Sequence, residues 1–222
     1  MKTVTCLVFT IACFAITLPA AAQGESLSES EYKIALAKAF DTASARARRI
    51  FTEETYHTGS QVTGRRKIVS HFAGPDAKKM EVTEEFNGRK SKSDSVRIGQ
   101  QFFCREGDKG WKQADKECAK GGKMMAIPDG KYEFSVESNP NDPAGRIYTR
   151  RATFTDSGNP ERDAARLKFI EIKFATDESG AITRYTETRR GGIEPNGWSS
   201  TQVTRYDYQP ADMKITDPTK GN

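Results

Sequence analysis

The chain has 222 residues, of which 36% are hydrophobic and 29% are charged, and its formal net charge is +5. The basic residues are spread along the sequence, whereas a nucleic-acid-binding protein concentrates them on one face, often with stacking aromatic residues between them. We therefore exclude nucleic acid as a partner and expect one globular domain.

Residues 1–22 have the features of a secretory signal peptide. Lys2 supplies the positive charge, Val4 to Leu18 form the apolar stretch, and Pro19 to Ala22 form a small-residue cleavage site. The apolar run is shorter than the roughly 20 residues that span a bilayer, so we expect no transmembrane segment after the signal is removed. The prediction is a periplasmic or secreted domain of residues 23–222, either soluble or, as an alternative, lipid-anchored at Cys13.

The first element of this domain is an amphipathic helix. Ser28 and Glu31 have the spacing of a capping box, and no glycine or proline interrupts Glu29 to Phe51. An apolar stripe at steps of three or four residues predicts that one side of this helix packs on a sheet. Its members are Leu36, Phe40, Ala43, Ala47 and Ile50. Arg46, Arg48 and Arg49 then complement the dipole at the end of the helix.

From Tyr56 onward the pattern is typical of β-strands. A short run at 67–72 is followed by alternation of apolar and polar residues at 79–86, and Asn87–Gly88 is a favoured pair for a type I′ hairpin. The returning strand, Arg89 to Ile98, is polar up to Val96. Gly99 and Gln100 predict a further hairpin into Gln101 to Arg105.

The mature chain has two cysteines, Cys104 and Cys118, because Cys6 and Cys13 are removed with the signal. An even number of cysteines in an exported chain favours a disulfide. A metal or redox pair is the alternative, but His57 and His71 are distant in sequence and no C-x-x-C motif occurs. We expect a disulfide and no metal.

The segment from Ala119 to Gly130 is the least strand-like part of the middle of the chain. Met124 and Met125 lie between Gly121–Gly122 and Pro128, so an apolar piece has flexible ends. Methionine suits a surface that accepts irregular ligands. The segment is either a lid over an apolar hollow or a loop that packs its methionines into the core.

The second half of the domain alternates polar and apolar residues between turn signals, which predicts a meander of antiparallel strands. The expected strands are residues 131–137, 146–155, 165–176, 181–189 and 198–208. The apolar phase changes at Phe169 and Ile170, which indicates a β-bulge or a strand covered on both faces. Met213 to Pro218 read as a last edge strand.

Motifs for chemistry are missing from the sequence. There is no nucleophile elbow, Walker A loop, H-E-x-x-H or G-x-G-x-x-G. His71 is interpreted as a partly buried strand residue, and carboxylates close in sequence, such as Glu84 and Glu85, are not necessarily close in space. We expect no cofactor and no catalysis, although a hydrolase with paired carboxylates remains an alternative.

The order of parts resembles the LolA-like superfamily of extracytoplasmic lipoprotein carriers, which includes mycobacterial lipid-carrying lipoproteins and RseB-type sensors. The resemblance rests on the signal, the helix from Glu29, the meander and a closing pattern. That pattern comprises Asp177, Gly180, Ile182, Arg184, Tyr206, Tyr208, Ile215 and Pro218. It implies an α+β, mainly β domain, in which a curved antiparallel sheet forms an open half-barrel covered by the N-terminal helix and a lid loop.

The expected ligand is the acyl chain of a lipid or lipoprotein, held in an apolar cavity between helix and sheet at roughly 0.8 kcal/mol per buried CH₂. We predict the cavity wall to be Leu36, Phe40, Met124, Met125, Phe134, Phe154, Ile172 and Tyr185. The alternative is an interaction or sensing module of the same fold, with a filled interior and a protein partner in the cell envelope.

Overall fold

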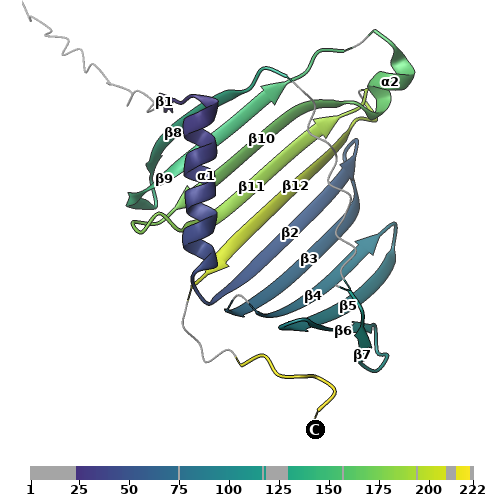
Figure 1. The fold of residues 1–222 in the computed structure, drawn as a ribbon. Helices are drawn as coiled ribbons and strands as arrows, with labels where there is room; N and C mark the ends of the chain where they lie inside the picture. The colour runs from purple at the N-terminus through teal and green to yellow at the C-terminus, as the bar shows by residue number, and fades with distance from the viewer. Residues whose placement is uncertain are drawn as a thin grey trace, which may run out of the picture.

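The computed structural model describes residues 24–74, 76–116, 118, 130–156, 158–193, 195–208 and 214–220. Within these ranges, a single open 12-stranded antiparallel sheet carries two helices (Figure 1). In chain order the elements are β1 (Glu25–Ser26), α1 (Glu29–Ser44), β2 (Arg48–Thr58), β3 (Gln61–Gly74), β4 (Ala77–Phe86), β5 (Arg89–Ile98), β6 (Gln101–Glu106), β7 (Lys112–Ala114), β8 (Glu133–Asn139), β9 (Asp142–Thr153), α2 (Pro160–Ala165), β10 (Leu167–Thr176), β11 (Ile182–Gly191) and β12 (Trp198–Asp207). The predicted half-barrel of mainly β structure with an N-terminal helix is confirmed.

The sheet joins two meanders side by side. Its strand order is β1-β8-β9-β10-β11-β12-β2-β3-β4-β5-β6-β7, so β1 lies at one edge while β2 lies in the middle, paired with β12. Helix α1 connects these two strands and must therefore cross β8 to β12, as Figure 1 shows. Strands are about 4.8 Å apart and a helix rises about 1.5 Å per residue, so the 16 residues of α1 match this span.

Helix α1 begins where the capping box predicts and ends earlier than predicted. Ser28 N–H donates to Glu31 Oε2 at 2.8 Å, and Glu31 N–H donates to Ser28 Oγ at 3.2 Å. The last helical residue is Ser44 instead of Phe51. Arg48 explains the early end, because its Nη1 donates to the carbonyls of Ala43 and Ser44 and satisfies groups that a longer helix would use.

The buried side of α1 also differs from the predicted stripe. Tyr32, Ala39 and Ala43 are buried, whereas Phe40 is 38% exposed. Phe40 follows Ala39 by one residue, about 100° around the helix, so both cannot face the sheet. The small side chains of Ala39 and Ala43 let the helix approach Phe174 closely.

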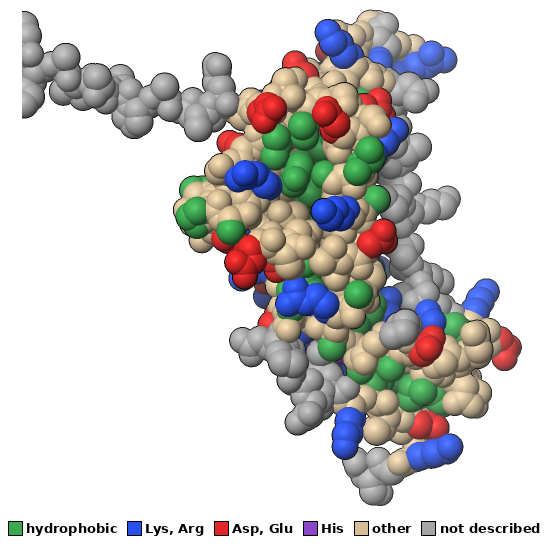
Figure 2. All heavy atoms as spheres, turned by 60° about the vertical axis from the view of Figure 1, so that its left-hand side comes forward, with side chains coloured by type: hydrophobic (Ala, Val, Ile, Leu, Met, Phe, Trp, Pro, Cys, Tyr) green, Lys and Arg blue, Asp and Glu red, His purple; other side chains and the backbone are tan. Residues whose placement is uncertain are grey.

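The outer side of α1 carries Ile34, which is 65% exposed. On the side of the molecule drawn in Figure 2, hydrophobic side chains reach the surface in small groups, with Lys, Arg, Asp and Glu side chains around them.

The hairpins of the first meander follow the prediction. Asn87 and Gly88 both have positive φ, at 48° and 76°, as a type I′ turn requires. β5 has the predicted bounds, and its residues 89–93 are exposed. Cys104 on β6 forms the predicted disulfide with Cys118, with their Cα atoms 5.6 Å apart.

The second meander contains one confirmed irregularity and two corrections. The register of β10 against β11 shifts between Leu167 and Phe169, so an irregularity lies directly before the predicted phase change at Phe169 and Ile170. The turn before β10 leads into the short helix α2, which was not predicted. Asn159 Oδ1 caps this helix by accepting from Glu161 N–H at 3.1 Å. The predicted edge strand at 213–218 is wrong, because residues 214–217 form no strand and Met213 lies outside the described residues.

Two apolar clusters form the core on the face of the sheet that α1 covers, which we call the helix face. The first joins Tyr32, Ala39 and Ala43 of α1 to Phe174 and Ile182. The second lies beside it and comprises Ala152, Leu167, Ile170 and Ile172. Both belong to β8–β12 and the elements around them, so this half of the helix face is filled by the protein's own side chains.

Candidate functional site

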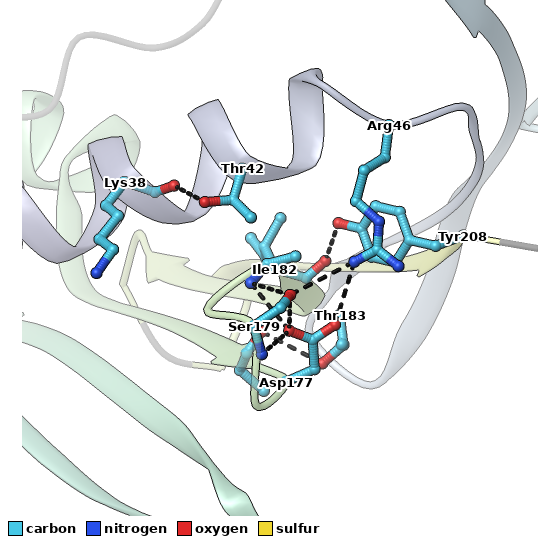
Figure 3. A network of polar contacts seen from close by, with 10 residues as sticks. Lys38, Thr42, Arg46, Asp177, Ser179, Ile182, Thr183 and Tyr208 are labelled. Atoms are coloured by element: carbon cyan, nitrogen blue, oxygen red, sulfur yellow. Dashed lines mark hydrogen bonds and ion pairs between the residues drawn. The ribbon is translucent and has the colours of Figure 1, made fainter.

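The C-terminal end of α1 is fixed to the turn between β10 and β11 (Figure 3). Arg46 Nη1 lies 3.5 Å from Asp177 Oδ2 and donates to Ser179 Oγ at 3.4 Å. The guanidinium carbon of Arg46 also lies 4.2 Å from the centre of the Tyr208 ring, and the Tyr208 hydroxyl donates to the carbonyl of Ile182. These contacts hold the C-terminal end of α1 against β11 and the end of β12. They mark the point beyond which α1 no longer covers the sheet.

Beyond α1, the helix face continues as a strip of small and apolar side chains that we call the apolar strip. Directly opposed residues of antiparallel strands share a face, so the registers trace continuous rows from β12 to β5. One row is Thr204, Thr52, Ile68, Val82 and Ser93, and the other is Tyr206, Ile50, Ser70, Met80 and Ser95. Thr52, Ser70, Met80, Val82 and Thr204 are buried.

One flank of the apolar strip is a row of paired charges. Arg66 Nε lies 2.9 Å from Glu84 Oε1, and Arg66 Nη1 lies 3.7 Å from Glu54 Oε2. The hydroxyl of Tyr56 donates to Glu54 Oε2 at 2.6 Å. The side chains of Arg66 and Glu54 are only 15% and 14% exposed, so these charges are partly removed from water and depend on one another.

The other flank is basic. Arg48, Phe72, Lys78 and Arg97 stand directly opposite one another on β2, β3, β4 and β5. The guanidinium carbon of Arg48 lies 4.2 Å from the centre of the Phe72 ring. The apolar strip is thus two rows wide between charged rows, a shape that suits a long, narrow apolar group.

A cavity of about 130 Å³ lies at the end of the apolar strip, around the disulfide. Its lining combines Met80, Val82, Cys104 and Cys118 with the charged residues Asp94, Arg105 and Glu106 and with two serines. A larger groove, of about 560 Å³, lies at the β1–β8 edge of the sheet. Its lining includes Glu133, Ser135, Glu137, Thr149, Arg151 and Lys173, so it is polar and less suited to an apolar ligand.

Tyrosines of the helix face are held in the neutral form. Burial raises the pKa of Tyr32 and of Tyr206 to about 12. Burial and the Glu187 carboxylate, which accepts from the Tyr185 hydroxyl at 2.7 Å, raise the pKa of Tyr185 further. These phenols therefore act as hydrogen-bond donors at neutral pH.

The structure separates the predicted cavity-wall residues into groups. Leu36 and Phe134 pack against the first apolar cluster and Phe154 against the second, Ile172 is part of the second, and Tyr185 touches both. Phe40 lies at the surface of α1. Met124, Met125 and the predicted lid lie outside the described residues. Ligand binding by this set stays a prediction.

The sequence did not predict the apolar strip or its charged flanks. Arg66 is preceded by Arg65, and Glu54 is preceded by Glu53, so each has a neighbour of the same charge. Arg65 and Glu53 are exposed on the face of the sheet opposite the helix face, which we call the outer face. Only strand register tells which member of each pair faces α1. His71, by contrast, is a partly buried residue of β3 as predicted, and burial together with Arg49 and Lys79 lowers its pKa.

In the part of the chain that the structure describes, no three His, Cys, Asp or Glu side chains gather as a metal site would require. No described helix combines the length and the apolar character needed to cross a membrane.

An open antiparallel sheet with an amphipathic helix across one face is the class that this structure defines. No protein-family model and no curated protein matches the chain. Among solved structures, a LolA superfamily protein from Nitrosomonas europaea is similar at 11% identity and a TM-score of 0.30, over 84% of this chain and 94% of that one.

Two further solved structures are similar over most of their length. A putative outer membrane lipoprotein-sorting protein domain from Vibrio parahaemolyticus has 10% identity and a TM-score of 0.31, over 82% of this chain and 94% of that one. The complex of MucA and MucB from Pseudomonas aeruginosa contains a chain with 9% identity and a TM-score of 0.17, over 82% of this chain and 100% of that one.

Proposed function

We propose that this chain is an extracytoplasmic binding module that holds the acyl chain of a lipid or lipoprotein against the apolar strip. The observation that carries the proposal is the strip itself, which continues the helix face past α1 with charged rows on both sides. An acyl chain lying there loses contact with water along its length, while the flanking charges keep their own partners and solvent.

The dimensions of the strip support this ligand. From β12 to β5 it crosses five neighbouring strands, a distance of about 19 Å at about 4.8 Å per spacing. Each CH₂ group buried there contributes about 0.8 kcal/mol. The floor has no bulky aromatic side chain between Thr204 and Val82 in its first row, because Thr52 and Ile68 occupy β2 and β3.

Export is part of the proposal. Residues 1–22 would act as the signal peptide and residues 23–222 as one binding domain, with an anchor at Cys13 as the alternative. The Cys104–Cys118 disulfide supports an oxidising compartment outside the cytoplasm. We propose binding without catalysis, since the described residues of the helix face present paired charges and neutral phenols.

The test uses two neighbouring residues of β3 that face opposite sides. Ile68 lies on the apolar strip and Val69 lies on the outer face, and both are partly exposed. Wild type should retain lipid detectable by mass spectrometry after purification and should take up a fluorescent fatty acid. Ile68→Arg should lose both properties while Val69→Arg keeps them. Equal uptake by the two variants, or no uptake by wild type, would contradict the proposal.

A second candidate is an envelope sensing module that binds a protein instead of a lipid. Phe174, Ile170 and Ile182 are fully buried, so the half of the helix face near α1 is filled by the protein itself. Capture of a protein partner by the purified domain, with no lipid in the complex and no fatty acid uptake, would favour this candidate over the first.

A further inference from the structure

Arg150 on β9 is a charged residue placed between apolar neighbours. In the sheet it stands directly opposite Phe134 of β8 and Ile172 of β10, so it points to the helix face. Its guanidinium carbon lies 4.0 Å from the centre of the Tyr132 ring. Its Nε is buried and has no hydrogen-bond partner among the described residues. A guanidinium N–H that has lost water without gaining an acceptor is costly and calls for a functional reason.

A second unsatisfied donor lies close by on α1. Tyr32 is 2% exposed, and its hydroxyl is buried without a hydrogen-bond partner in the described part of the chain. Its ring packs against Phe134 at 5.2 Å and Phe174 at 5.5 Å between centroids. The hydroxyl is near enough to Arg150 for that charge to lower its pKa against the larger opposite effect of burial.

Other charged groups in this region are already paired. Glu187 accepts from Arg189 Nε and from the Tyr185 hydroxyl, and Glu29, on the first turn of α1, pairs with Lys33 at 2.7 Å. Arg189 is thereby committed to Glu187, while no carboxylate of the described residues lies within ion-pair distance of Arg150. Within the described residues, Arg150 therefore remains available to an anion from a ligand.

We infer that Arg150 and Tyr32 bind the carboxylate or phosphate group of an amphipathic ligand. Arg150 supplies the charge and N–H donors, and Tyr32 supplies a neutral O–H donor. The residues beside Arg150, among them Tyr132, Phe154 and Ile172, contact only the part of the ligand next to its anionic group. The acyl chain extends from there to the apolar strip, which begins at β12, three strand spacings or about 14 Å from β9. This inference rests on the proposed function, to which it adds a preference for anionic over neutral amphiphiles.

The test compares a long-chain fatty acid with the fatty alcohol of the same length, at a pH where the carboxylate is ionised, by displacement of a fluorescent probe. Acetate and inorganic phosphate are the free-anion arm. Wild type should bind the fatty acid at least about tenfold more tightly than the alcohol, because a charged hydrogen bond is worth roughly that factor. Arg150→Met should abolish this preference, Arg150→Lys should keep part of it, and Tyr32→Phe should reduce it.

Arg151→Met is the matched control. Arg151 is the next residue of β9, faces the other side of the sheet and pairs with Glu171, so its loss should leave the preference unchanged. Arg150→Met should also melt at a higher temperature than wild type without ligand, since it removes a poorly satisfied charge.

Two outcomes separate this inference from the proposed function. If wild type binds the fatty alcohol and the fatty acid equally well, the anion site is wrong while acyl-chain binding stands. If neither amphiphile binds, both are overturned. Binding of acetate or phosphate as tight as that of the fatty acid would also overturn the inference, because the site would then take a free anion.

Discussion

The hydroxyls of Thr52 and Thr204 lie 3.0 Å apart on adjacent strands β2 and β12, although 152 positions separate them in the sequence. Both residues are buried, at 9% and 5% exposure. This hydrogen bond lies where the two meanders join. It gives each of the two buried hydroxyls a partner within the apolar strip.

A double-mutant cycle tests this pair. Thr52→Val or Thr204→Val alone should lower the free energy of unfolding by about 1–2 kcal/mol, because the remaining hydroxyl loses a buried partner. The double variant should cost less than the sum, since two valines leave nothing unsatisfied. Urea unfolding measures all three, and strictly additive losses would show that the hydroxyls do not interact.

Removal of Arg66 should destabilise the protein. Arg66→Met leaves Glu54 and Glu84 facing each other across β3 without their shared cation, which we expect to cost about 2 kcal/mol. Lys67→Met is the control, because Lys67 is 66% exposed and its pair with Glu53 lies on the outer face. That change should cost less than about 0.5 kcal/mol. Equal losses in chemical unfolding would contradict the account of this flank.

The disulfide should contribute measurably to stability. Cys104 and Cys118 are 14 positions apart, and closing a loop of this size is worth about 3 kcal/mol in the chain-entropy model. The variant with Cys104→Ser and Cys118→Ser should unfold at a lower urea concentration than oxidised wild type. Wild type in reducing agent is the control and should match the variant; an unchanged midpoint in both would show that the bond carries no stability.

Stability should fall steeply at alkaline pH. The pKa values of Tyr32 and Tyr206 are raised to about 12 in the folded protein, against 10.0 for a free side chain. The unfolded chain therefore loses these protons first, so the stabilisation is present below pH 10 and is lost as pH rises from 10 toward 12. Each tyrosine contributes about 1.4 kcal/mol per pH unit in that window.

Tyr206→Phe isolates one of these contributions. The variant should show a shallower loss of unfolding free energy between pH 10 and 12 than wild type, measured by urea unfolding at each pH. Identical slopes for the two proteins would mean that Tyr206 ionises as easily in the folded state as in the unfolded one.

Local signals predicted most of the strands and turns. Asn87–Gly88 fixes its hairpin by backbone conformation alone, and the irregularity next to Phe169 is visible in the sequence as a change in apolar phase. The C-terminal end of α1 was harder to predict. Ala47 and Ile50 continue a helical spacing, but Ile50 also fits the alternation of a strand. Pairing of β2 with β12 decides between the two, and no local pattern reveals a partner so far along the chain.

The candidate site depended even more on register. Arg150 and Arg151 are adjacent and identical in type. Arg150 faces α1 and its Nε finds no acceptor in the described part of the chain, whereas Arg151 pairs with Glu171 on the opposite face. Likewise, Ile68 and Val69 are neighbouring apolar residues in the sequence, and only the strand register shows that they lie on opposite faces of the sheet. Sequence alternation gives the two faces of a strand, and only tertiary structure tells which face is covered.

The most direct measurement of the central claim is photo-crosslinking with a long-chain fatty acid that carries a diazirine on its tail, followed by mass spectrometry of the labelled residues. If the acyl chain lies on the apolar strip, the labels fall on helix-face residues such as Ile68, Met80 and Val82, and excess unlabelled fatty acid removes them. Labels confined to outer-face residues such as Val69 and Glu81, or labels that do not respond to competitor, would contradict acyl-chain binding by this surface.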